Sequence, residues 1–217
     1  MRVFRGRADT IAADHERTDA VVAEAVERGE PALRVWTPHQ QVAFGRRDAR
    51  TDGYADATVA AERRDYPAVE RDVGGRAVAF TGSTLAVVHA DPGADRTAIQ
   101  ARYDRTAECV SRALTRVGVD ATDGEPPDSF CPGTHSLQAN GKLAGLAQRV
   151  RSDAAITAGV VLVADHDAVA TVLSPVYDAL GVPFDPGSVG SVARAGGPAD
   201  PQRVADVLVD AFDNSDV

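Results

Sequence analysis

The 217-residue chain contains almost no lysine. Of its 23 basic residues, 22 are arginine and one, Lys142, is lysine. Two cysteines, Cys109 and Cys131, are the whole thiol content. They could pair, but a reducing cytoplasm keeps such thiols free, and two cysteines do not make a structural zinc site. We therefore expect neither a disulfide nor a metal ion.

Long apolar runs and an excess of positive charge are also missing. No apolar run approaches the ~20 residues that span a bilayer, and the start, MRVFRGRADTIAADHERTD, lacks the apolar stretch of a signal peptide. These absences predict a cytoplasmic protein without a membrane segment. A net charge of -9 and a pI of about 5.0 disfavour nucleic acid as a partner, because phosphate-backbone binders present a basic face.

Length and composition are those of an ordinary globular protein. Hydrophobic residues make up 44% and charged residues 25%, close to average usage. A chain of 217 residues lies below the roughly 250 at which hydrophobic cores tend to split. We therefore expect one domain over residues 1–217.

Capping residues predict helices near both ends of the chain. The first helix runs from a cap at Asp9 or Thr10 until Gly29 ends it, and the last begins with Asp200 as cap and Pro201 in its first turn. Further helices are predicted at 54–64, 99–117, 167–173 and 175–180.

Strand patterns lie between these helices in an irregular order. The predicted strands are 32–36, 41–45, 69–80, 83–90, 142–149 and 156–163. The third and fourth read as a hairpin, interrupted by Gly74 and Gly75. This interleaving predicts an α/β (α+β) fold with a mixed, largely antiparallel central sheet flanked by helices.

Cys131 and Lys142 are the candidate chemical groups. Cys131 lies in the Pro- and Gly-rich loop 123–133, where catalytic groups are common, although unpaired cysteine is also a frequent buried hydrophobe. High-GC coding or a saline cytoplasm explains the many arginines but not one retained lysine. A flexible ammonium can lower the pKa of a thiol and stabilise an oxyanion.

Other polar residues around Cys131 allow two interpretations. His135 is a candidate base or a surface histidine. The pair Gly74-Gly75 either admits a ligand to the backbone or forms a bulge. The arginines Arg71, Arg76, Arg149 and Arg151 form either a basic rim or a solvated face.

Three segments, in this order, resemble one known family: RVWTPHQQVAFGRRDAR, ERDVGGRAVAFTGSTLAVV and SFCPGTHSLQANGKLAGLAQR. The third resembles the signature of cysteine-dependent octanoyltransferases of the lipoate-protein ligase superfamily, where a Cys-Pro-Gly loop precedes Gly-Lys, Ala-Gly and Gln-Arg. The second resembles that family's Arg-x-x-Gly-Gly-x-Ala-Val segment, and the first its opening strand pair. The resemblance covers residues 34–163.

The resemblance implies roles for individual residues. Cys131 is the expected acyl-carrying nucleophile, and Lys142 the motif lysine that contacts the acyl carbonyl. The residues expected to bind substrate are Arg71, Gly74, Gly75, Arg76, Ala77, His135, Gly145 and Gln148. The implied fold is the sheet with flanking helices that biotin and lipoate ligases share.

Some positions depart from the family pattern. Phe80 and Thr81 stand where other branches carry His and an acidic or Gly residue, and Arg76 adds a charge to the glycine segment. These departures leave the acyl donor and the pocket size open. The Gly-Arg-Gly-Arg signature of biotin ligases is absent, its nearest counterpart being residues 45–48, which disfavours biotinylation.

The implied activity is transfer of an octanoyl or lipoyl group from a carrier-protein thioester, through Cys131, to the lysine of a lipoyl domain. This route needs no cofactor. The expected partners are lipoyl domains of 2-oxoacid dehydrogenases or the glycine cleavage H protein, with acyl carrier protein as a possible donor. One alternative is a lipoate-protein ligase, which requires ATP and Mg and makes a lipoyl-adenylate; another is a non-catalytic lipoyl-domain or acyl-binding protein.

Overall fold

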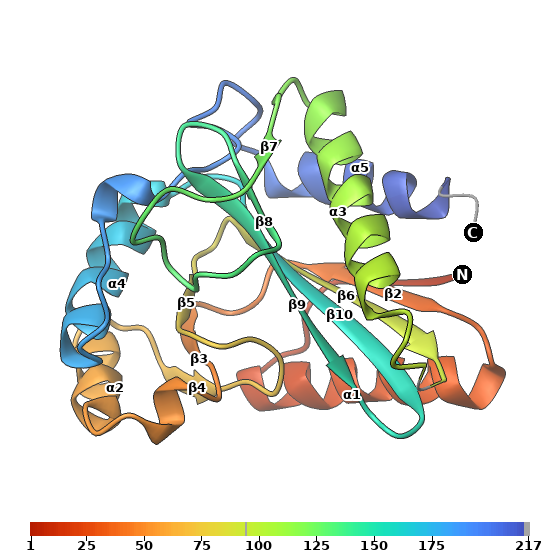
Figure 1. Ribbon diagram of the computed structural model, residues 1–217, viewed down its shortest axis with the longest axis horizontal. Helices are drawn as coiled ribbons and strands as arrows, with labels where there is room; N and C mark the ends of the chain where they lie inside the picture. Colours follow the sequence, from red (N-terminus) through yellow and green to blue (C-terminus); the bar gives the residue numbers. More distant parts are fainter. Residues whose placement is uncertain (94, 215–217) are drawn as a thin grey trace.

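The computed structural model describes residues 1–93 and 95–214, which form two sheets and five α-helices (Figure 1). The helices are α1 (Ile11–Arg28), α2 (Tyr54–Glu62), α3 (Ile99–Arg116), α4 (His166–Ala179) and α5 (Pro201–Asp213), with 3-10 turns η1 (Asp48–Arg50) and η2 (Pro186–Ser188). The strands are β1 (Arg2–Arg5), β2 (Ala32–Trp36), β3 (Gln41–Phe44), β4 (Ala68–Glu70), β5 (Val78–Phe80), β6 (Thr84–Pro92), β7 (Thr122–Asp123), β8 (Ser136–Gln138), β9 (Lys142–Val150) and β10 (Ala154–Leu162).

The larger sheet has seven strands in the order β1-β2-β6-β10-β9-β8-β7. β1 and β2 are parallel and the other neighbours are antiparallel. The smaller sheet has the order β4-β3-β5, with β3 and β4 parallel. The predicted mixed, largely antiparallel sheet with flanking helices is therefore confirmed.

The terminal helices begin and end as the capping residues predict. The hydroxyl of Thr10 accepts a hydrogen bond from the Ala13 amide, and Gly29 ends α1 in the left-handed conformation. At α5, the Asp200 carboxylate accepts from the Gln202 amide. Local hydrogen bonding thus defines both helices before any tertiary contact is considered.

The predicted hairpin of residues 69–80 and 83–90 is wrong. β5 pairs with β3 in the smaller sheet, whereas β6 pairs with β2 and β10 in the larger one. The turn between them is held by the Thr84 hydroxyl, which accepts from the Thr81 amide at 3.1 Å. The chain therefore passes from one sheet to the other here, and the strands 32–36 and 41–45 are likewise divided between the two sheets.

The helices predicted at 167–173 and 175–180 are one continuous helix, α4, with Pro175 inside it. Proline removes one backbone hydrogen bond, but buried residues lie on both sides of it, including Leu173 and Val176. Packing of α4 against α2 and the smaller sheet (Figure 1) outweighs the local break. The short strands β1, β7 and β8 were not predicted, because two to four residues carry no clear pattern.

The two faces of the larger sheet have different coverings. Leu33, Val35 and Val87 pack with α3 and α5 on one face. On the other face, α1 covers Ala32 and Val88, while the smaller sheet with α2 and α4 covers the strand ends around Val160. The second face is therefore divided between two coverings. None of the helices in the described residues combines the length and apolarity that crossing a bilayer requires.

A buried ion pair attaches α1 to the larger sheet. Arg34 on β2 is fully buried and bonds to the Asp14 carboxylate, which also accepts from the Trp36 indole at 3.0 Å. The Arg34 guanidinium lies over the Trp36 ring, 3.9 Å from its centroid. Removing one partner of such a pair leaves an uncompensated charge in the interior.

Asp14→Ala is expected to lower the free energy of unfolding by about 3–5 kcal/mol, because Arg34 loses its counter-charge. Urea unfolding followed by circular dichroism measures this. Asp19→Ala is the control, since Asp19 forms an exposed pair with Arg151 and should cost less than about 1 kcal/mol. Equal losses for the two variants would contradict a structural role for the buried pair.

Candidate active site

Cys131 lies in the loop between β7 and β8 and has a φ of 41°. This left-handed conformation is uncommon for a residue with a side chain and requires support from its surroundings. The neighbouring Phe130 is fully buried and anchors the loop in the core. The sequence correctly predicts a turn at this position.

Lys142 holds the backbone of the Cys131 loop from the interior of the protein. Its side chain is buried, with a relative exposure of 1%. Its Nζ donates to the Phe130 carbonyl at 2.9 Å, the Cys131 carbonyl at 2.7 Å and Glu125 Oε2 at 2.6 Å. An ammonium group has three donors, and all three are used. The expected contact between Lys142 and an acyl carbonyl remains a prediction.

Glu125 is one of the site residues that the sequence did not predict; Tyr177 is the other. Besides Lys142, its carboxylate accepts from the Ser136 hydroxyl at 2.8 Å and from the Gly133 amide at 3.0 Å. It therefore neutralises the buried lysine and joins both ends of the Cys131 loop. One acidic residue in a segment with several gives no sequence signal for this role.

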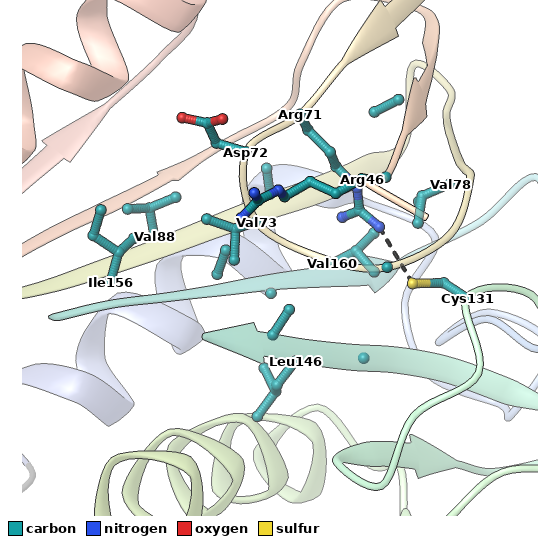
Figure 2. Close-up of a pocket in the computed structure, with 18 of the residues that line it drawn as sticks. Arg46, Arg71, Asp72, Val73, Val78, Val88, Cys131, Leu146, Ile156 and Val160 are labelled. Atoms are coloured by element: carbon teal, nitrogen blue, oxygen red, sulfur yellow. Dashed lines mark hydrogen bonds between the residues drawn. The ribbon is translucent and has the colours of Figure 1, made fainter. Parts of the chain in front are cut away.

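The hydrogen bond to the thiol sulfur comes from Arg71. Arg71 Nη2 lies 3.2 Å from Cys131 Sγ and 2.8 Å from the Arg76 carbonyl (Figure 2). The guanidinium occupies space that a side chain at position 74 would need: a Cβ there would lie 2.7 Å from Arg71 Cζ, and the φ of Gly74 is 106°. The predicted glycine pair thus makes room for a side chain of the same chain.

These neighbours determine the pKa of the thiol. Burial raises the pKa of Cys131, but the charges of Arg71 and Lys142, with hydrogen bonds from the backbone amides of Arg76 and Gly75, lower it by more. The net pKa lies below that of an ordinary cysteine. The environment therefore favours the thiolate, which is the nucleophilic form.

Tyr177 on α4 connects the loop to the glycine segment. Its hydroxyl accepts from the Cys131 amide at 2.5 Å and donates to the Ala77 carbonyl at 2.9 Å. Burial, and then the nearby Cys131, raise the pKa of Tyr177 well above its usual value. The phenol therefore stays protonated and can serve both partners at once.

A cavity of about 610 Å³ opens beside Cys131, within the usual size range of small-molecule sites. Figure 2 shows Cys131 and Arg71 at one end, Val160 in the middle, and Val88 and Ile156 at the far end. These walls are mainly apolar. The cavity can therefore hold an apolar chain whose reactive end lies at the thiol.

Only some of the predicted substrate-binding residues line the cavity. Gly75, His135 and Gly145 line the cavity with Arg71, and the His135 ring stacks on Tyr103 at 3.6 Å between centroids. The other predicted positions lie behind the wall. Those of the glycine segment are Gly74 beside Arg71, Arg76 paired with Asp48 at 3.0 Å, and the fully buried Ala77.

Gln148 lies on the opposite face of the larger sheet from the cavity. Its side chain accepts from Arg102 Nε at 3.1 Å and donates to the Thr157 hydroxyl at 3.2 Å. It thereby connects β9 to α3 and does not line the cavity, so its expected contact with substrate stays a prediction. Alternation along β9 explains the difference, because Gly145 and Ala147 face the cavity and the residue after Ala147 faces away.

The family model of the lipoyl protein ligase A/B catalytic domain matches residues 11–213. The chain belongs to this family. The match extends over nearly all of the described structure, including the Cys131 loop and every strand except β1.

Curated relatives carry the name octanoyl-[GcvH]:protein N-octanoyltransferase. The one from Exiguobacterium sp. (strain ATCC BAA-1283 / AT1b) is 28% identical over 162 residues, which is 74% of this chain and 58% of the relative. The one from Geobacillus kaustophilus is 30% identical over 144 residues, which is 64% of this chain and 50% of the relative. The chain thus spans about half the length of the curated relatives it matches.

Solved structures share the fold. A lipoate-protein ligase A bound with ATP superposes with a TM-score of 0.71 at 22% identity, over 98% of this chain and 84% of that one. The bipartite lipoate protein ligase of Thermoplasma acidophilum gives 0.67 at 18% identity, over 98% and 82%. The predicted ligase-like fold is confirmed.

Arg71→Met is expected to raise the pKa of Cys131, because it removes the cation that contacts the sulfur. The rate of iodoacetamide alkylation against pH measures this, in a Cys109→Ala background, and its midpoint should move to higher pH. Arg116→Met, an exposed substitution, is the matched control. An unchanged midpoint in Arg71→Met would show that the guanidinium does not hold the thiolate.

Lys142→Met is expected to lower the free energy of unfolding by about 3–5 kcal/mol, because Glu125 is left without its cation. In the Glu125→Gln, Lys142→Met double variant, the free energy of unfolding should fall by less than the sum of the decreases in the two single variants, because both charges are then gone. Urea unfolding of all four proteins completes the cycle. Additive losses would mean that the two side chains act independently.

Proposed function

We propose that the chain is an acyltransferase that moves an octanoyl or lipoyl group from a carrier protein to the lysine of a lipoyl domain, through a thioester on Cys131. The observation that supports this most directly is the Arg71–Cys131 contact at the mouth of an apolar cavity. A thiol with a lowered pKa beside space for an acyl chain fits nucleophilic acyl transfer. The names of the curated relatives support the same reaction.

In the first step, the Cys131 thiolate attacks the acyl carbonyl of the donor. A carbon–sulfur bond forms, the bond to the donor breaks, and the departing thiol or amine takes up a proton. The Arg71 guanidinium, which holds the thiolate beforehand, stabilises the negative charge that passes to the carbonyl oxygen. The apolar walls around Val160 hold the alkyl chain away from water.

In the second step, the neutral amine of the acceptor lysine attacks the thioester. A carbon–nitrogen bond forms, the bond to Cys131 breaks, and the thiolate returns to its contact with Arg71 while the ammonium proton is released. Lys142 and Glu125 keep the loop in place throughout. This role as positioning residues uses the contacts that they already make.

Partners follow from the names of the relatives and from the family. The proposed donor is an octanoylated GcvH-type protein, with acyl carrier protein as the second candidate, and the proposed acceptors are lipoyl domains of 2-oxoacid dehydrogenases. Exchange between two lysine amides, or from thioester to amide, requires neither ATP nor a metal ion. We place this activity in the cytoplasm, in one catalytic domain over residues 1–217.

The test is intact-protein mass spectrometry after incubation with octanoylated GcvH or octanoylated acyl carrier protein, without ATP. We expect a hydroxylamine-sensitive octanoyl adduct on Cys131 that disappears when an unmodified lipoyl domain is added and becomes octanoylated. Cys131→Ala should abolish both signals. Cys109→Ala should retain them, because Cys109 is fully buried.

The ligase alternative gives a different result in the same experiment. If the acceptor is modified only when free octanoate or lipoate, ATP and Mg are supplied, and Cys131→Ala retains that activity, the chain is a ligase and the thioester mechanism is wrong. If neither route modifies an acceptor, the chain is a non-catalytic member of the family.

A further inference from the structure

Three exposed arginines lie together at the mouth of the cavity. Arg46 and Arg47 follow β3 after Gly45, Arg50 ends η1, and all three line the cavity that contains Cys131. Figure 2 shows Arg46 on the wall that also carries Arg71 and Val73. We call these three residues the arginine patch.

The backbone under the arginine patch is firmly attached to the glycine segment. The buried Asp48 accepts from the Gly45 amide at 3.1 Å and from Arg76 at 3.0 Å. The Arg47 amide donates to the Gly75 carbonyl at 3.1 Å. A Cβ on Gly45 would lie 2.3 Å from the Gly75 carbonyl carbon, so the two segments touch through their backbones. The backbone of the patch is therefore held against the glycine segment that packs beside Arg71.

No residue of the arginine patch forms an ion pair with any described carboxylate, although other arginines near the cavity do. Arg76 pairs with Asp48, and Arg149 with Asp72. Acidic residues are not scarce, since the chain has 32 of them against 23 basic ones. What distinguishes these three from other exposed arginines is their place: they line the cavity that contains Cys131, on a chain that is acidic on balance.

We propose that the arginine patch is the docking surface for an acidic face of the carrier protein that reacts at Cys131. This inference rests on the proposed function, in which two proteins in turn must bring a lysine or a thioester to one thiol. A chain of net charge -9 repels an acidic carrier at long range, so a local basic surface is needed to orient the approach. Arginine suits this role because its planar fork binds carboxylates in two places.

The test is charge reversal with the full-length enzyme. In the Arg46→Glu, Arg47→Glu, Arg50→Glu triple variant, the KM for octanoylated carrier should rise roughly tenfold or more, with kcat little changed. In wild type the same KM should rise with added salt, because exposed charges are screened. The triple variant should have lost this salt dependence.

The matched control reverses three exposed arginines outside the cavity lining: Arg63→Glu, Arg116→Glu and Arg203→Glu. It changes the net charge by the same amount and should leave the KM for carrier near that of wild type. Equal increases of KM in the two triple variants would overturn the proposal, since bulk charge would then be the cause. An unchanged KM in the patch variant would also overturn it.

Two further measurements separate this proposal from the proposed function. Acylation of Cys131 by S-octanoyl-N-acetylcysteamine, which is small and uncharged, needs no docking, so reversal of the patch should reduce it far less than it reduces acylation by the carrier. Binding of unmodified carrier to Cys131→Ser enzyme, measured by calorimetry, should weaken only when the patch is reversed.

If carrier binding depends on the patch but no acyl-enzyme forms, the docking surface is retained and the transferase mechanism is refuted. ATP binding that depends on the patch, with carrier binding unaffected, would assign the patch to phosphate and overturn the proposal.

Discussion

The buried ammonium of Lys142 is the interaction on which the rest of the site depends. Its three hydrogen bonds go to Glu125 and to the carbonyls of Phe130 and Cys131. A compact group with three rotatable donors can satisfy three acceptors that converge from different directions, whereas the planar fork of arginine cannot. A chain that uses arginine at 22 of 23 basic positions therefore has its one lysine where three acceptors converge on a single nitrogen.

Reactivity and loop support are divided between two cations. Lys142 holds the backbone of the Cys131 loop from the interior, and Arg71 contacts the sulfur from the side of the cavity. Burial alone would raise the pKa of the thiol, but the two charges and the amides of the glycine segment together lower it below that of an ordinary cysteine. Gly74 belongs to this arrangement because its missing side chain admits the guanidinium.

The sequence predicted features that depend on neighbouring residues, such as helix ends and turns. It did not predict features that depend on contacts between distant segments. Caps defined α1 and α5, and the Pro- and Gly-rich loop indicated a special position at Cys131. The division of the apparent hairpin between two sheets had no local signal, because both strands have the same apolar pattern. Glu125 and Tyr177 were missed for a related reason: their roles arise from contacts with residues 17 and 46 positions away.

The site lies where the two sheets meet, and this position couples folding to reactivity. The thiol comes from a loop of the larger sheet, while Arg71 follows β4 of the smaller sheet. The Tyr177 hydroxyl bridges them through the Cys131 amide and the Ala77 carbonyl. A thiolate with a lowered pKa therefore forms only when both sheets and α4 are in place.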